Sequence, residues 1–295
     1  MLDKNILILG ETGLLAQAVT EIASHKGYKA YFASRSRGCD LTSQNVCKDL
    51  SNLCERVQPS LIFNATGITD LNYCEKKPEQ AWLLHVRLPA IIAKIASRTK
   101  CPWVHISTDH YYNSKENILH REQDVTTPPN EYATSKLAGE TLALTSESAL
   151  VIRTNIIGRR RWVNQSTFAE WVMGCLRGKK TFDAYIDTWA SSIEVKQFVN
   201  LALALAESGE KGLINLACSV SISKAELIEK IAYHSGYSTE FMNKVKTPCP
   251  TVGQVKRANA MGLDCSIAEK RLFDLGLSLP NADDVAIAVA KSFME

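Results

Sequence analysis

The chain has 295 residues, of which 45% are hydrophobic and 22% are charged, and its formal net charge is +3. That length allows a sizeable core in one large domain or two lobes, whereas so small a charge gives no reason to expect nucleic acid or an anionic membrane as a partner. No apolar run is long enough to span a membrane, and the nine scattered cysteines form neither a disulfide framework nor a zinc motif, so we expect no metal and a cytoplasmic protein with reduced thiols.

The first half of the chain alternates apolar runs with helical patterns. Residues 6–9 are predicted to form a buried strand, and residues 14–25 the first helix. Further strands are expected at 28–33, 61–63, 103–106 and 150–152, and further helices at 45–57, 78–98 and 131–146. Strands separated by helices at this spacing predict an α/β fold with a Rossmann-like, doubly wound parallel sheet.

After about residue 158 the pattern loosens, beginning with a charged, irregular stretch at residues 159–162. Helices are expected at 168–177, 193–207, 224–234 and 267–275, and a strand at 213–216. The sequence therefore predicts one domain over residues 1–158 and a smaller lobe over residues 159–295, with segments of the lobe returning to the sheet.

Gly10 and Gly13 allow a sharp turn between the first strand and the first helix, and they bring bare backbone N–H groups close to a ligand. The start of that helix adds unsatisfied N–H groups and a partial positive charge, which together suit a phosphate. Two glycines at this spacing also occur in ordinary strand–helix turns. Their position after a first strand favours a dinucleotide-binding turn.

Arg35 and Arg37 follow the second strand, where a dinucleotide fold holds the adenosine ribose. Guanidinium groups can accept a 2′-phosphate, so NADP(H) is favoured as the cofactor, with NAD(H) left open. Asp40 and Leu41 come next and can border the adenine. The alternative is that both arginines are simply solvated in a polar loop.

Asn64, Ala65 and Thr66 follow the third strand directly. Ligands of such sheets bind outside the carboxyl ends of the strands, so the ribose and pyrophosphate can pass here. The alternative for Asn64 is that it braces neighbouring loops without contacting a ligand.

Thr108 ends the fourth strand, and Tyr132 and Lys136 share one face of the helix that follows. Tyrosine is a poor acid at neutral pH because its pKa is about 10, and a nearby ammonium lowers that pKa. Tyr132 can then donate a proton to a carbonyl oxygen as a hydride reaches the carbon, while the Thr108 hydroxyl holds the same oxygen. Ser107 is an alternative to Thr108, and an ordinary surface helix pair is the alternative for Tyr132 and Lys136.

At these residues the chain resembles the extended short-chain dehydrogenase/reductases. Within them it is most similar to the dTDP-4-dehydrorhamnose reductase group, which also includes the regulatory β subunit of methionine adenosyltransferase. The resemblance implies an NADP-binding domain, a C-terminal substrate-binding lobe, and NADPH-dependent reduction of a keto group on a nucleotide-linked deoxysugar. The matching segments are 10–15, 39–42, 64–66, 107–109, 130–140, 152–154 and 257–264.

The resemblance also assigns roles to single residues. It implies catalysis by Thr108, Tyr132 and Lys136. We expect Asp109, His110, Asn155 and Arg257 to be near the substrate. With Arg37 added from the charge argument, the expected cofactor residues are Gly10, Thr12, Gly13, Leu14, Leu15, Arg35, Arg37, Asp40, Leu41, Asn64, Ala65, Thr66, Tyr132 and Lys136.

Departures from the group leave the sugar open. Members of the group have Asn where this chain has His85, Tyr where it has His110, and Ser-Trp where it has Asn155 and Ile156. As a lone helical histidine, His85 is expected to pack in the interior. A nucleotide-sugar epimerase and a non-catalytic NADP-binding regulatory subunit remain alternative functions. A homodimer is an open expectation by analogy, since long helices of this fold often pair between chains.

Overall fold

The computed structural model describes residues 4–160, 166–251 and 253–294. Residues 161 and 162 of the irregular stretch expected at 159–162 therefore lie outside the described residues. The chain forms two compact units: the first holds residues 1–108, 130–153 and 199–214, and the second holds residues 109–129, 154–198 and 215–295. The units interleave along the chain, and the division of roles at residue 158 stays a prediction.

The first unit is built on a six-stranded sheet with the strand order β11-β6-β4-β3-β1-β2. The pairs β1–β2, β1–β3, β3–β4 and β4–β6 are all parallel, which confirms the predicted sheet. β11 follows a segment that returns from the second half of the chain, as expected. The strands are β1 (Asn5–Leu9), β2 (Lys29–Ala33), β3 (Leu61–Asn64), β4 (Trp103–Ile106), β6 (Ala149–Arg153) and β11 (Gly212–Asn215).

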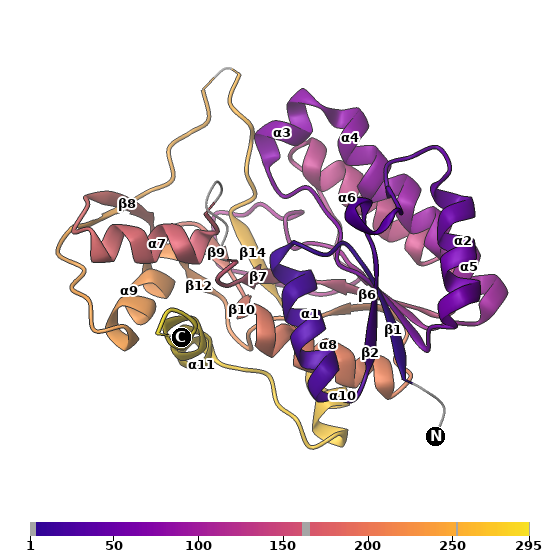
Figure 1. The fold of residues 1–295 in the computed structure, drawn as a ribbon. Helices are drawn as coiled ribbons and strands as arrows, with labels where there is room; N and C mark the ends of the chain where they lie inside the picture. The colour runs from indigo at the N-terminus through magenta and orange to yellow at the C-terminus, as the bar shows by residue number, and fades with distance from the viewer. Residues whose placement is uncertain (1–3, 161–165, 252, 295) are drawn as a thin grey trace. The chain divides into compact units, whose positions relative to one another are not determined.

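Helices cover both faces of this sheet (Figure 1). On one face lie α2 (Val46–Val57), α5 (Leu88–Thr99) and α6 (Glu131–Ala143), and on the other lie α1 (Leu14–His25) and the end of α8 (Val195–Glu207). Lys4 and Lys26 both pair with Glu207, which fastens the end of α8 beside α1. The remaining short elements are η1 (Arg35–Arg37), α3 (Leu71–Lys76), α4 (Pro78–Trp82) and η2 (Leu83–Arg87).

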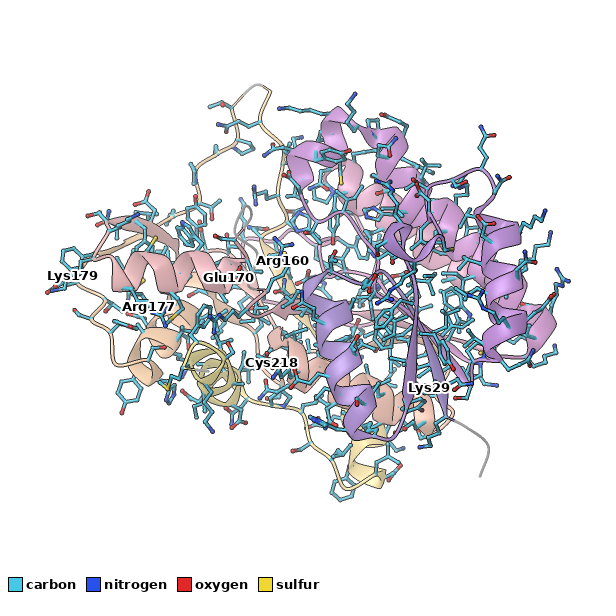
Figure 2. The ribbon with its side chains drawn as sticks, in the orientation of Figure 1. Lys29, Arg160, Glu170, Arg177, Lys179 and Cys218 are labelled. Carbon is cyan, nitrogen blue, oxygen red and sulfur yellow. The ribbon has the colours of Figure 1, made fainter. Side chains whose placement is uncertain are left out.

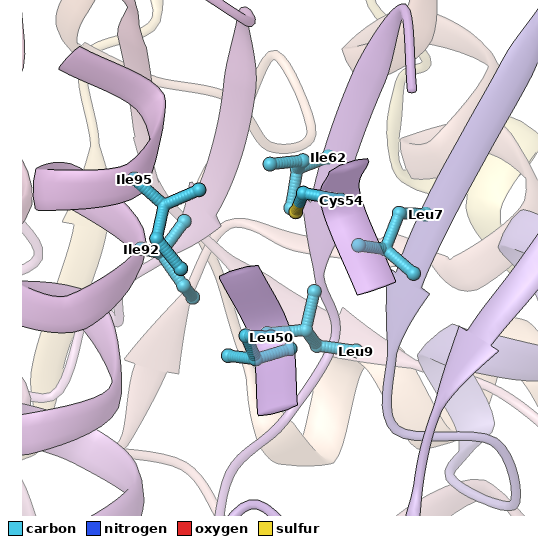
Figure 3. Close-up of a pocket in the computed structure, with 7 residues that line it drawn as sticks. All are labelled: Leu7, Leu9, Leu50, Cys54, Ile62, Ile92 and Ile95. Carbon is cyan, nitrogen blue, oxygen red and sulfur yellow. The ribbon is translucent and has the colours of Figure 1, made fainter. Parts of the chain in front are cut away.

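The core of the first unit follows from the alternation of side chains along the strands. Leu7 and Leu9 of β1 point to the same face and meet Leu50 of α2 and Ile92 of α5 around a small apolar cavity (Figure 3). Ile6 and Ile8, which alternate with Leu7 and Leu9 along the strand, are also fully buried, as expected for a strand covered on both faces. Only hydrocarbon and a cysteine line the cavity, so it belongs to the core and offers no polar group to a substrate.

The single helix expected at residues 78–98 is wrong as a continuous element. It is divided into α4, the π-helical segment η2 and α5. Proline has no backbone N–H to donate four residues back along a helix. Pro89 therefore leaves the carbonyl of His85 without its usual helical partner, and the chain widens there into a π turn.

Gly139 of α6 packs directly against that turn. A Cβ atom built on Gly139 would lie 1.7 Å from the carbonyl oxygen of His85, a backbone atom that cannot rotate away. Only a residue without a side chain allows this approach. The close packing of α6 against η2 therefore requires glycine at position 139.

We expect Gly139→Ala to destabilise the protein by about 1–3 kcal/mol, because the added methyl group must push α6 away from η2. The matched control is Gly174→Ala, in the exposed interior of α7 (Phe168–Arg177), where an added Cβ meets no heavy atom within 4 Å. That change should stabilise by about 0.5–1 kcal/mol, since alanine favours a helix over glycine. Urea unfolding measures both; equal stabilities of the two variants would contradict the close approach.

The second unit combines short sheets with three helices that share a core. Its two-stranded sheets pair β7 with β10 and β8 with β13, and its four-stranded sheet has the order β12-β9-β14-β5. The helix expected from residue 193 begins at Val195, because Ile193 lies in strand β10. The elements of this unit not yet given are β5 (Leu119–His120), β7 (Asn155–Ile157), β8 (Phe182–Tyr185), β9 (Trp189–Ala190), β10 (Ser192–Glu194), β12 (Ile222–Ser223), α9 (Lys224–His234), β13 (Met242–Val245), β14 (Ala260–Leu263), α10 (Ser266–Asp274) and α11 (Ala282–Ser292).

Side chains of α7, α9 and α11 form that core. Two of these helices begin with a capping box, formed by Thr167 and Glu170 at α7 and by Asn281 and Asp284 at α11. The expected helices at 168–177 and 224–234 are confirmed at those bounds, whereas α11 and most of the short strands were not predicted.

Within the described ranges, no helix has both the length and the apolar character needed to cross a bilayer. Among the same residues, no group of three or more His, Cys, Asp or Glu side chains is arranged to hold a metal ion. Cys54, Cys101 and Cys218 are buried free thiols, as expected. Burial raises the pKa of Cys101 to about 12, which keeps that thiol protonated and unreactive.

Candidate active site

The turn after β1 leaves an open approach to backbone N–H groups. Gly10 has φ +89°, a left-handed conformation that favours glycine, and its N–H donates to the carbonyl of Ala33 at 3.0 Å. Gly13 caps α1 with no side-chain hydrogen bond, and a Cβ built on it meets no heavy atom within 4 Å. The first N–H groups of α1 can therefore face a phosphate, with Thr12 exposed and Leu14 and Leu15 partly buried beside them.

The chain passes from β1 to β2 on one side and then returns across β1 to β3, so the sheet has its switch point between β1 and β3. The N–H of Ala65 donates to the carbonyl of Leu9 at 3.1 Å, and a Cβ on Gly10 would lie 3.5 Å from Cγ2 of Thr66. The structure thus brings Gly10, Ala65 and Thr66 together. Dinucleotides bind in the crevice at such a switch point, and these residues fit one.

Asn64 braces this loop from within. Its Oδ1 accepts hydrogen bonds from the N–H and the hydroxyl of Thr66, at 3.2 and 2.6 Å, and its Nδ2 donates to Nδ1 of His105 at 3.1 Å. The Asn64 side chain is buried, as the bracing alternative implies. His105, which the sequence did not single out, stays neutral because burial lowers its pKa well below the usual range.

Both arginines after β2 have acidic partners. Nε of Arg35 donates to Asp40 at 3.0 Å, although the Arg35 side chain remains 79% exposed. Arg37 donates two hydrogen bonds to Glu11, which lies between Gly10 and Gly13 and was not predicted as a site residue. Leu41 is buried in the core of the first unit. The cation side chains are therefore present where expected, and each carries a counter-charge.

Lys136 is anchored at the carboxyl end of β4. Its Nζ donates to the carbonyl of Ile106, two residues before Thr108. Burial lowers the pKa of Lys136 to about 8, and the Glu140 carboxylate opposes that shift, so the ammonium predominates at neutral pH. Tyr132 lies one helical turn before Lys136 on α6, on the same face. All three predicted catalytic residues thus belong to the first unit.

Ser107 is held in a buried ionic network. Its hydroxyl donates to the Glu140 carboxylate at 2.6 Å, and Arg153 donates to both oxygens of that carboxylate, at 3.0 and 2.6 Å. The Glu140 and Arg153 side chains are each 4% exposed. This network engages the Ser107 hydroxyl with Glu140. The arginine at the end of the otherwise apolar strand β6 was the available sequence signal for the Glu140–Arg153 pair, which was not predicted.

His85 supports the first turn of α6. Its Nε2 accepts the N–H of Ile68 at 2.9 Å, so its Nδ1 carries the proton and donates to the Ser135 hydroxyl at 2.9 Å. That hydroxyl in turn donates to the carbonyl of Tyr132 at 3.0 Å. The His85 and Tyr132 rings meet edge to face. His85 is buried, as expected for a packed histidine, and burial holds its pKa well below the usual range.

The candidate substrate residues lie in the second unit, where Asn155 and Asp109 are directly hydrogen-bonded. Asn155 donates to the buried Asp109 at 2.7 Å and accepts from the Ser192 hydroxyl at 2.8 Å. Nε2 of His110 accepts the N–H of Ala258, next to the exposed Arg257. Burial, and then the positive charge of Arg257, lowers the pKa of His110 to about 4. His110 is therefore a neutral hydrogen-bond acceptor.

The described part of the basic run at residues 159–161 is engaged within the second unit. Arg159 donates to the carbonyl of Ser292 at 2.8 Å and lies over the ring of Phe293. The backbone N–H of Arg160 donates to the carboxylate of Glu170 on α7, and Figure 2 labels both residues. Arg159 is thus engaged at the end of α11.

Comparisons with known proteins found similar sequences and folds. The family model described as RmlD substrate binding domain matches residues 4–274. The protein named "Probable low-salt glycan biosynthesis reductase Agl14", of Haloferax volcanii, is 23% identical to this chain over 298 residues, and the match covers 98% of each chain. The dTDP-4-dehydrorhamnose reductase of Salmonella typhimurium is 28% identical over 194 residues, and the match covers 63% of this chain and 62% of that one. The crystal structure of dTDP-4-dehydrorhamnose reductase from Bacillus anthracis in complex with NADP has a TM-score of 0.84 at 17% identity, covers 98% of each chain, and shows the same fold.

Proposed function

Because the chain belongs to the RmlD substrate binding domain family, we propose that it is an NADPH-dependent reductase of a keto group on a nucleotide-linked deoxysugar. The observation that carries this proposal is the buried ammonium of Lys136, held at the end of β4 one turn from Tyr132. A buried cation beside a phenol is the arrangement that makes tyrosine an effective proton donor near neutral pH. Relatives named as reductases support the same activity.

In this reaction NADPH supplies the hydride when bound. Tyr132 donates its hydroxyl proton to the keto oxygen, and the Lys136 ammonium stabilises the phenolate that remains. The Thr108 hydroxyl donates a hydrogen bond to the same oxygen and fixes its position. His85 acts through the Ser135 hydroxyl, which orients the backbone at Tyr132, and through its edge-to-face contact with the Tyr132 ring. It is a positioning residue.

The first unit supports the cofactor assignment through its own geometry. The open backbone at Gly13 and the start of α1 suit the pyrophosphate, and the loop after β3 suits the adjoining ribose. Arg35 and Arg37 suit a 2′-phosphate, which favours NADP(H). For the nucleotide sugar we propose Asp109, Asn155, His110 and Arg257 as contacts, and we propose a cytoplasmic homodimer as the form of the protein.

The decisive experiment is turnover. Purified protein with NADPH and a panel of nucleotide-linked 4-keto deoxysugars should consume NADPH, followed as the loss of absorbance of the reduced nicotinamide. Normal NADPH binding with no turnover on any 4-keto sugar would instead favour a regulatory, non-catalytic subunit. Interconversion of sugar epimers without net consumption of NADPH would favour an epimerase.

A further inference from the structure

Glu11 ties the glycine turn to the loop after β2. One carboxylate oxygen accepts the hydroxyls of Ser34 and Ser36, each at 2.7 Å, and the other accepts Nε and an Nη of Arg37, at 3.0 and 2.8 Å. Those hydrogen bonds, above all the one from Ser36, lower the pKa of Glu11 to about 2. The carboxylate is therefore fully ionised at any physiological pH.

This carboxylate is located where the adenosine ribose of a dinucleotide is expected, at the end of β2. Arg37 is one of the two cations available there for a 2′-phosphate, and Glu11 already occupies two of its donors. A carboxylate that holds one edge of a guanidinium occupies two of its donors and offsets its charge, so a carboxylate and a phosphate compete for the same cation. A free 2′-hydroxyl has no charge and can itself donate to a carboxylate oxygen.

Arg35 has a different counter-charge. It pairs with Asp40, whose other oxygen accepts the N–H and hydroxyl of Thr42 within the same loop. No hydrogen bond or ion pair recorded in the described part of the chain joins Arg35 to the glycine turn. Glu11 therefore acts through Arg37 and not through Arg35.

We propose that Glu11 sets the nucleotide preference of this site by competing with the 2′-phosphate of NADP(H) for Arg37, which allows NAD(H) to be used as well. This inference rests on the proposed dinucleotide-dependent function and adds to it the residue that controls cofactor choice. Removing the carboxylate charge should free Arg37 for the phosphate and leave the rest of the nucleotide site intact.

The test is calorimetric titration of NADP⁺ and NAD⁺ into the wild type, Glu11→Gln, Arg37→Gln and the double variant. We expect Glu11→Gln to raise the preference for NADP⁺ over NAD⁺ about tenfold, mainly through tighter NADP⁺ binding, since two like charges no longer meet. The double variant should lose that gain, because the effect acts through Arg37. Glu55→Gln, the same change of charge on an exposed position of α2, should leave the ratio unchanged.

An unchanged ratio in Glu11→Gln, or a gain that persists in the double variant, would overturn this inference while leaving the reductase proposal intact. A wild type that binds neither nucleotide would overturn both. A normal thermal midpoint checks that Glu11→Gln is folded. If that variant does not fold, Glu11→Ala serves for the same comparison, with the same outcomes.

Discussion

Replacing Tyr132 by phenylalanine is expected to lower turnover at least about a thousandfold, because no proton then reaches the keto oxygen as hydride is transferred. The ring is retained, so its edge-to-face contact with His85 survives. Backbone hydrogen bonds of α6 do not involve the phenol. NADPH affinity should therefore stay within a few-fold of the wild type, and the stability should change little.

Turnover of a 4-keto nucleotide sugar and direct titration of NADPH measure the two effects separately. Tyr73→Phe is the matched control, because Tyr73 lies on α3 of the same unit with 43% of its surface exposed. It should retain full activity. Loss of folding in Tyr132→Phe would show instead that the hydroxyl is structural, and retained turnover would remove Tyr132 from the chemistry.

Glu140→Gln is expected to destabilise the protein by about 3–5 kcal/mol, since it leaves the Arg153 guanidinium buried without a counter-charge. Both side chains of this pair are 4% exposed, so water cannot replace the lost partner. The Ser107 hydroxyl loses its carboxylate acceptor in the same change. The Glu140 carboxylate also raises the pKa of Lys136, so its loss should lower that pKa further. Less of the Lys136 ammonium would then be present at neutral pH, and activity should decline as well.

Urea unfolding at pH 7 measures this effect. The control is Glu147→Gln, an exposed residue beyond the end of α6 with no recorded ion pair in the described chain, whose stability should match the wild type. Combining Glu140→Gln with Arg153→Met removes both charges and should recover much of the loss. A single variant as stable as the wild type would mean that the pair is hydrated.

Local sequence signals were sufficient for the regular parts of the fold. α1, β4, α7 and α9 follow from hydrophobic periodicity, glycine turns and capping residues, all of which act within a few residues of the chain. The continuous helix expected at 78–98 is interrupted at Pro89, which lies within a long apolar pattern. Its effect appears only in the backbone hydrogen bond that it removes from the turn at His85.

By itself the sequence determined the alternation of strands and helices, the parallel sheet, the glycine turn, and the placement of Tyr132 and Lys136 one turn apart. These properties depend on residues close together in the chain. Only the tertiary structure decided that Glu11 holds Arg37, that Ser107 belongs to the Glu140–Arg153 pair, and that Asn64 braces a loop against His105. Each of those contacts joins residues that are distant in the sequence. Hydrogen bonds and ion pairs depend on how close two groups lie in space, which a local sequence pattern does not predict.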